Sequence, residues 1–276
     1  MRLAHRVVPG PPGAPTLLLL HGVTRNGRDW ETLLPELTGD WRVCVADHCG
    51  HGDSPRTPGE YRVADYARHT AEFLRASFSE RVTVMGHSLG AMVALSLAVE
   101  CPDQVAAIVL EDPPFHTMGR DIAATPYCAQ FAGMAEVARR GGDIAGMADG
   151  LAAIRLSPTR RLGDVRDRAS LELSAEFLAR VDPEVFTPLA AGRWLDGFEA
   201  AHLWPRVSCP VLLLQGDPAA GGAFTDADVS MATRALRTHR LVRFPGTGHQ
   251  IHRSRPAEVA AALRDFTLSL TASSSP

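Results

Sequence analysis

Short, unbroken apolar runs recur along the chain and alternate with longer segments in which apolar residues repeat at helical spacing. Runs without a polar residue at every second position are typical of strands that helices cover on both faces. The alternation predicts an α/β protein with a mostly parallel, doubly wound sheet. The strands are expected at 3–8, 16–20, 42–46, 81–85, 105–110, 211–214 and 241–244, and the helices at 30–37, 63–78, 89–100, 225–236 and 256–270.

The alternation stops after Asp112 and resumes near residue 206. Between these points we expect no strand, because the segments 130–140, 143–155 and 163–180 are rich in Ala, Leu and Arg and the region is broken by Pro126, Pro158, Pro183 and Pro188. A block inserted there lies past the carboxyl end of a strand, where open α/β sheets bind ligands. We therefore expect an all-helical cap at 113–205 on a core made of 1–112 and 206–276. The alternative is a side domain without a role in binding.

Composition favours a small-molecule substrate over a macromolecular partner. The 276 residues are 45% hydrophobic and 21% charged, with a net charge of −3, so the chain offers no basic field for nucleic acid or for an anionic membrane. The five cysteines lack C-x-x-C spacing, which favours a reduced compartment. No apolar run is long enough to span a bilayer or to act as a signal segment. We expect a cytoplasmic protein; the oligomeric state is left open.

The sequence Gly86-His87-Ser88-Leu89-Gly90 lies between an apolar run and an Ala- and Leu-rich stretch. A G-x-S-x-G motif between a strand and a helix is typical of a sharp turn that exposes a nucleophilic serine, and its glycines remove Cβ atoms that would clash. The backbone amide of Leu89 would then face an oxyanion formed at Ser88. The alternative is an ordinary glycine-rich turn.

A serine nucleophile needs a base, and His249 is the best candidate. It follows the strand expected at 241–244 in a short glycine loop, C-terminal to the serine. A second oxyanion donor is expected from the amide of Val23, because a strand ends there in the turn His21-Gly22. His21 itself is expected to brace that loop.

Together these motifs resemble the α/β-hydrolase fold family, and more narrowly its capped serine esterases and lactonases. The resemblance extends over nearly the whole chain and includes residues 47–54, which are similar to the family's D-x-R-G-x-G-x-S loop, with Cys49 in place of the arginine. The cluster of His48, Cys49, His51 and Asp53 could suggest a metal site. Its match to a structural loop argues against one, and we expect neither a metal nor a cofactor.

The acidic partner of His249 is ambiguous. In most relatives it stands three residues after a glycine that follows a late strand, but here that position is Ala219. A subset of capped relatives carries the acid at the end of the strand after the nucleophile's helix, which corresponds to Asp112, 24 residues beyond Ser88. We assign Asp112, with Asp217 as the runner-up. Glu111 ranks third because its side chain should face the opposite side of the strand.

The expected reaction is cleavage of a carboxylic ester or lactone of a small, largely apolar substrate through an acyl-enzyme. The alternatives are carbon–carbon bond hydrolysis or thioester hydrolysis by the same residues, or a small-molecule receptor that retains them. Core packing would explain the apolar residues of the insertion equally well. The expected pocket residues are His87, Phe115, Met118, Tyr127, Phe131 and Trp194, with Met134 nearby.

Overall fold

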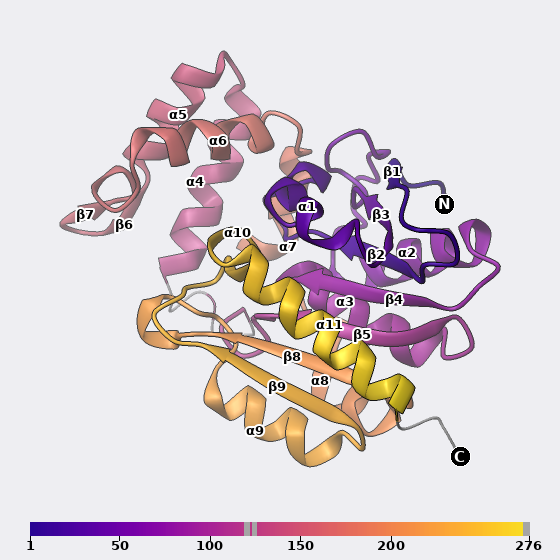
Figure 1. Ribbon diagram of the computed structural model, residues 1–276. Coiled ribbons are helices and arrows are strands. Elements are labelled where there is room, and N and C mark those ends of the chain that lie inside the picture. The colour runs from indigo at the N-terminus through magenta and orange to yellow at the C-terminus, as the bar shows by residue number, and fades with distance from the viewer. Residues whose placement is uncertain (119–121, 123–125, 273–276) are drawn as a thin grey trace.

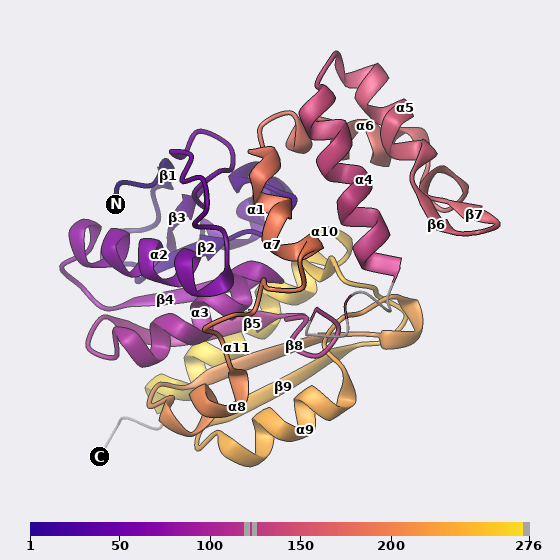
Figure 2. The same ribbon diagram turned by 180° about the vertical axis from the view of Figure 1, so that it is seen from behind.

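The computed structural model describes residues 1–118, 122 and 126–272, and its centre is a seven-stranded sheet with helices on both faces (Figures 1 and 2). The strand order is β1-β3-β2-β4-β5-β8-β9; β1 pairs antiparallel with β3, and the other neighbours are parallel. This confirms the predicted doubly wound sheet. Its strands are β1 (His5–Val8), β2 (Thr16–Leu20), β3 (Arg42–Ala46), β4 (Val82–His87), β5 (Val105–Glu111), β8 (Val211–Gly216) and β9 (His239–Phe244).

The central strands are apolar throughout because each face of the sheet has its own hydrophobic core. Alternate side chains of a strand point to opposite faces, so Leu18 and Leu20 belong to one core while Leu17 and Leu19 belong to the other. The first core includes α2 (Val63–Ser77) and α3 (Leu89–Glu100), and the second includes α11 (Pro256–Ala272). At about 25 cal/mol per Å² of buried apolar surface, such two-sided burial is the main stabilising contribution to the sheet.

The single helix expected at 30–37 is wrong, because the chain there forms a 3-10 helix at Gly27–Thr32 followed by the short α1 (Leu34–Leu37). The side chain of Asn26 accepts from the N–H of Arg28 and starts the first helix early. Pro35 lacks an N–H, so a continuous helix would lose a hydrogen bond there. The other core helices are α9 (Asp226–Ala235) and α10 (Ile251–Ser254), with a 3-10 turn at Pro218–Ala220.

The insertion, defined as residues 113–205, lies between β5 and β8, and its helices α4, α5 and α6 stand together beside one end of the sheet (Figure 1). Helices α7 and α8 return the chain toward the core. The described elements are α4 (Pro126–Arg140), α5 (Ile144–Ala153), α6 (Arg168–Leu178), α7 (Thr187–Ala190) and α8 (Ala200–Leu203), with 3-10 turns at Leu162–Asp164, Pro183–Phe186 and Trp204–Arg206.

The insertion is not all-helical, which corrects the expectation from the sequence. Strands β6 (Arg155–Ser157) and β7 (Arg160–Arg161) form a small antiparallel hairpin around Pro158-Thr159. Both strands are largely exposed, so they bury no apolar face and leave no period-2 hydrophobic pattern to read.

None of the helices within the described ranges has the length and apolar content needed to cross a membrane.

Candidate active site

Ser88 occupies a strained turn between β4 and α3. Its backbone has φ +55° and ψ −114°, a region that costs a non-glycine residue on the order of 1–3 kcal/mol. A Cβ on Gly86 would collide with the carbonyl of Gly90, and one on Gly90 would collide with the carbonyl of Leu20. Both glycines are therefore required for this turn to pack against the sheet.

His249 and Asp112 form a hydrogen-bonded pair, with 2.7 Å between His249 Nδ1 and Asp112 Oδ2. Asp112 follows directly after β5, is fully buried, and accepts backbone N–H groups from Gly216 (3.0 Å), Ala223 (2.6 Å) and Phe224 (3.2 Å). Burial alone would raise the pKa of Asp112, but the hydrogen bonds from His249 and these amides hold it below the usual value. The carboxylate therefore stays ionised next to the imidazole.

The two other acids considered for this position lie elsewhere. Asp217 is partly exposed to solvent at the 3-10 turn after β8, where it accepts the N–H groups of Ala219 (2.9 Å) and Gly246 (2.8 Å). Glu111 points to the opposite side of β5 and contacts His252, with 2.8 Å between Glu111 Oε1 and His252 Nδ1. The alternation of side chains along the strand separates Glu111 from Asp112.

One cavity of about 200 Å³ connects Ser88 and His249 with the turn that carries Gly22 and Val23. That turn lies against the serine, because a Cβ on Gly22 would be 3.3 Å from Ser88 Cβ and 3.1 Å from His87 Nδ1. Only a glycine leaves this approach unhindered. The amides of Val23 and Leu89 thus belong to the two segments that border the serine side chain.

The lining of this cavity includes most of the apolar residues expected to form the pocket: Met118, Tyr127, Phe131, Met134 and Trp194, together with His87. Phe115 is the exception and is a correction. Its ring packs edge-on against Trp204 (5.3 Å between centroids) and Phe224 (5.9 Å) and is stacked with Phe198. Phe115 therefore anchors the first turn of the insertion on the core rather than facing Ser88.

The loop 47–54 braces the turn at Val23. His21 Nε2 accepts the N–H of His48 (3.0 Å), and His51 Nε2 donates to the carbonyl of Val23 (2.7 Å). Burial lowers the pKa of His51 to about 4, so its ring is neutral at physiological pH. Within the described ranges, no three His, Cys, Asp or Glu side chains are grouped so that they could hold a metal ion.

His87 holds the loop of the catalytic histidine candidate. Its Nε2 donates to the carbonyl oxygen of His249 over 2.9 Å, and the two ring centroids are 4.6 Å apart. Burial, assisted by the neighbouring His249 and His252, lowers the pKa of His87 to about 3. The neutral ring therefore positions His249 without placing a competing charge next to it.

Two polar features of the site were not anticipated from the sequence. One is the buried contact of Glu111 with His252, on the far side of β5. The other is the presence of Arg25 and Arg166 in the wall of the Ser88 cavity. Arg25 could have been suspected from its place directly after the His-Gly turn, whereas the segment around Arg166 carries no recognisable motif.

Comparisons with known proteins agree with this architecture. The family model of the alpha/beta hydrolase fold matches residues 15–256. The chain is 40% identical over 107 residues to lipase LipV of Mycobacterium tuberculosis (38% of this chain, 39% of the lipase). It is 29% identical over 274 residues to the magnesium-chelatase 30 kDa subunit of Rhodobacter capsulatus (91% and 84%).

Several curated relatives match only over a short stretch, and the chain covers between 28% and 41% of their length. Among solved structures, the enol-lactonase of Burkholderia xenovorans LB400 superposes with a TM-score of 0.74 at 20% identity, covering 96% of each chain. At that identity the similarity shows the fold alone. The family model, by contrast, spans most of the sequence and includes Ser88, Asp112 and His249. The chain belongs to the α/β-hydrolase fold family.

Proposed function

We propose that this protein is a serine hydrolase that cleaves a carboxylic ester or lactone of a small organic substrate through an acyl-enzyme. The observation that carries the proposal is the shared cavity of Ser88 and His249, together with the 2.7 Å hydrogen bond from His249 to the buried Asp112. These three residues have the chain order and the strand–turn–helix context of this hydrolase architecture. A family member without such a constellation would have no means of activating a serine.

In the proposed mechanism, the Nδ1–H of His249 donates to Asp112, which leaves Nε2 free to accept the proton of Ser88 Oγ. The serine oxygen attacks the carbonyl carbon, and the amides of Val23 and Leu89 stabilise the negative charge on the carbonyl oxygen. His249 then returns the proton to the leaving alcohol. Water, deprotonated by the same nitrogen, attacks the acyl-enzyme and releases the acid and free Ser88.

The insertion would act as a cap over this site, with 1–112 and 206–276 as the core. Tyr127 and Phe131 of α4 and Trp194, which follows α7, line the cavity from the insertion, whereas Ser88 and His249 line it from the core. Cap closure of this kind excludes water and encloses the substrate. The cavity volume of about 200 Å³ is below the usual range for drug-sized ligands, which favours a small substrate.

The relatives support the ester and lactone class. A lipase and an enol-lactonase are among the proteins that this chain resembles in sequence or in fold. Lipases and enol-lactonases both break the bond between an acyl carbon and an ester oxygen, as the proposed acyl transfer does. The mainly apolar lining of the cavity near Ser88 suits the hydrocarbon part of such a substrate.

The test is serine-directed labelling together with turnover. We expect the wild-type enzyme to hydrolyse 4-nitrophenyl butyrate over many turnovers and to gain one fluorophosphonate adduct at Ser88 by peptide mass spectrometry. Ser88→Ala should lose both, whereas the matched control Ser96→Ala, a buried serine further along α3, should keep both. Turnover retained by Ser88→Ala would overturn the mechanism, and a single acylation without turnover would identify a receptor instead.

A further inference from the structure

The wall of the Ser88 cavity carries two guanidinium groups, from Arg25 and Arg166, and no Asp or Glu side chain among its described lining residues. Arg25 belongs to the same turn as Val23, on the core side. Arg166 belongs to the insertion, between β7 and α6. Two cations from separate parts of the chain therefore face one small, mainly apolar space.

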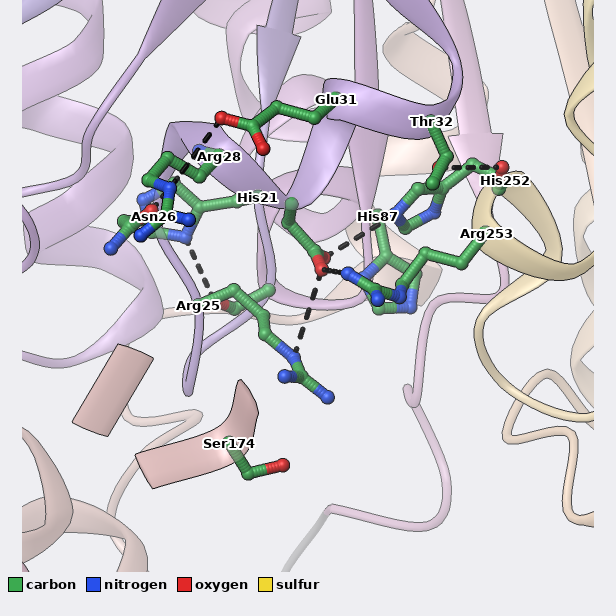
Figure 3. Close-up of polar contacts among 12 residues, drawn as sticks. His21, Arg25, Asn26, Arg28, Glu31, Thr32, His87, Ser174, His252 and Arg253 are labelled. Atoms are coloured by element: carbon green, nitrogen blue, oxygen red, sulfur yellow. Dashed lines mark hydrogen bonds and ion pairs between the residues drawn. The ribbon is translucent and has the colours of Figure 1, made fainter. Parts of the chain in front are cut away.

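Arg25 is held in place, yet its charge is not matched by a carboxylate of its own. Its side chain is only 8% exposed, its Nε lies 3.9 Å from Asp29 Oδ1, and its Cζ lies 5.0 Å from the centre of the Phe177 ring. The amide oxygen of Gln250, in the orientation that satisfies both groups, accepts from the Nε of Arg25 over 3.2 Å and from its Nη2 over 2.5 Å. Figure 3 shows Arg25 extending from the core toward Ser174 of the insertion.

Asp29 is already engaged by other cations. Its Oδ1 accepts from Arg253 Nη1 at 2.9 Å, and its Oδ2 lies 3.3 Å from His252 Nε2, within ion-pair distance although not aligned as a hydrogen bond. His252 also contacts Glu111, and these two carboxylates raise its pKa to about 9 despite the burial that would lower it. The positive charges of Arg253 and His252 thus balance the two negative charges of Asp29 and Glu111. The charge of Arg25 is additional to this balance.

Arg166 adds a second uncompensated charge. Burial lowers its pKa below the usual arginine value, and its Nη1 lies 3.5 Å from the hydroxyl of Ser174. The side chains of the described residues Arg166 and Asp167 form no ion pair, and the Asp167 carboxylate instead caps the next helix by accepting the backbone N–H of Ser170 at 2.7 Å. Burial lowers the pKa of Arg25 to about 10, and the nearby charge of Arg166 contributes in the same direction.

We propose that Arg25 and Arg166 together bind a carboxylate on the acyl part of the substrate, a short apolar chain away from the ester or lactone carbonyl. The proposal deepens the proposed hydrolase function and rests on it. The buried guanidinium of Arg25 and the partly buried one of Arg166 are costly without a counter-charge, and their planar N–H groups match a carboxylate. Because Arg25 is two residues from Val23, the carboxylate site lies on the wall that binds the acyl carbonyl oxygen.

The same polar end opens to solvent. Arg25, Arg166, Ser174 and Gln250 also border a second, open hollow, whose lining includes Arg253 and Asp167 as well. An anion approaching there would meet Arg25 and Arg166 before it reached the apolar region around Ser88, while Arg253 is paired with Asp29. The expected substrate is therefore apolar only in its middle part. It carries the ester or lactone group at one end and a carboxylate at the other.

The test compares two aryl esters of nearly equal shape. 4-Nitrophenyl hydrogen glutarate carries a terminal carboxylate where 4-nitrophenyl 5-methylhexanoate carries an isopropyl group. For the wild-type enzyme we expect kcat/KM to be about 30-fold higher for the glutarate ester, the ratio that a charge-assisted pair supports. Arg25→Met and Arg166→Met should each lower that ratio about tenfold, and the double variant should bring it near one. Arg160→Met, an exposed arginine of β7, should leave the ratio unchanged.

A binding measurement separates this proposal from the hydrolase function. Glutarate dianion should bind to the Ser88→Ala protein in calorimetry and should bind at least tenfold more weakly when Arg166→Met is added; that variant removes a partly exposed side chain, so folding is expected to survive. Glutarate binding without hydrolysis of either ester would overturn the hydrolase and keep the anion site. A ratio near one in the wild type, with no glutarate binding, would overturn the anion site and keep the hydrolase.

Discussion

Two consecutive residues at the end of β5, Glu111 and Asp112, each contact a histidine from the segment after β9, and the two pairs differ in exposure. The pair of Glu111 and His252 is completely buried. In the pair of Asp112 and His249, the carboxylate is buried but the histidine side chain is 33% exposed. The same two chemical groups therefore occur once in a closed interior and once at the edge of a cavity.

The exposure of the histidine determines what each pair can do. His252 lies between Glu111 and Asp29 and is charged at neutral pH, so neither ring nitrogen is available to a ligand. His249 has its Nδ1 fixed by a single carboxylate, and its ring reaches the cavity that contains Ser88. An acid–histidine contact alone therefore does not identify a catalytic pair; an open second nitrogen beside a nucleophile is also needed.

The largest expected difference between the two pairs concerns catalysis. Asp112→Asn should reduce kcat on 4-nitrophenyl butyrate by about 10⁴-fold, because the amide would donate to Nδ1 and place the proton of His249 on the nitrogen that must act as base. Steady-state kinetics measures this loss. Circular dichroism would check that the variant folds, since it also changes the acceptor for Ala223. A kcat within tenfold of wild type would contradict the assignment of Asp112.

The closed pair should instead contribute to stability. Glu111→Gln removes one charge from a fully buried cluster and should lower the free energy of unfolding by about 3 to 5 kcal/mol, measured by urea denaturation at pH 7. At low temperature, where the variant stays folded, kcat should remain within about tenfold of wild type. A loss of kcat similar to that of Asp112→Asn would mean that the two pairs are not functionally separate.

The pH dependence of stability should report on His252 itself. Its folded-state pKa of about 9 lies above the unfolded value near 6.5, so the stabilisation is complete below pH 6.5 and is lost as the pH rises through 9. Each unit of difference between the folded and unfolded pKa corresponds to about 1.4 kcal/mol. The free energy of unfolding should therefore fall by on the order of 3 kcal/mol over this pH range. Urea unfolding between pH 6 and 10 should show this decline in the wild type and in the exposed control His202→Asn, but not in His252→Asn.

The smallest effect is expected at Asp217, the carboxylate next to the site. Asp217→Asn should keep kcat within about threefold of wild type, because its side chain holds only the exposed turn after β8 and the N–H of Gly246. Loss of this capping interaction should cost about 1 kcal/mol of stability. The same ester assay provides the measurement. A large loss of kcat here, with Asp112→Asn active, would reverse the assignment of the acid.

Local sequence was sufficient wherever the determining interactions are local. The strands at Thr16–Leu20 and Arg42–Ala46 and the helix at Leu89–Glu100 match the predicted ranges, because continuous apolar runs and helical spacing reflect two-sided burial directly. The turn at Ser88 was readable for the same reason, since its glycines relieve clashes with nearby backbone. The hairpin at β6 and β7 was missed because its exposed strands bury no patterned face.

What only the tertiary structure decided is which distant groups meet and how much water reaches them. The sequence by itself placed Ser88 on its turn and put Asp112 and His249 after the ends of strands. It gave no sign that Glu111 and Asp29 enclose His252, that Phe115 faces Trp204 instead of Ser88, or that Arg25 and Arg166 share one cavity. Those contacts join segments tens to hundreds of residues apart, and their energies depend on burial, which no local pattern encodes.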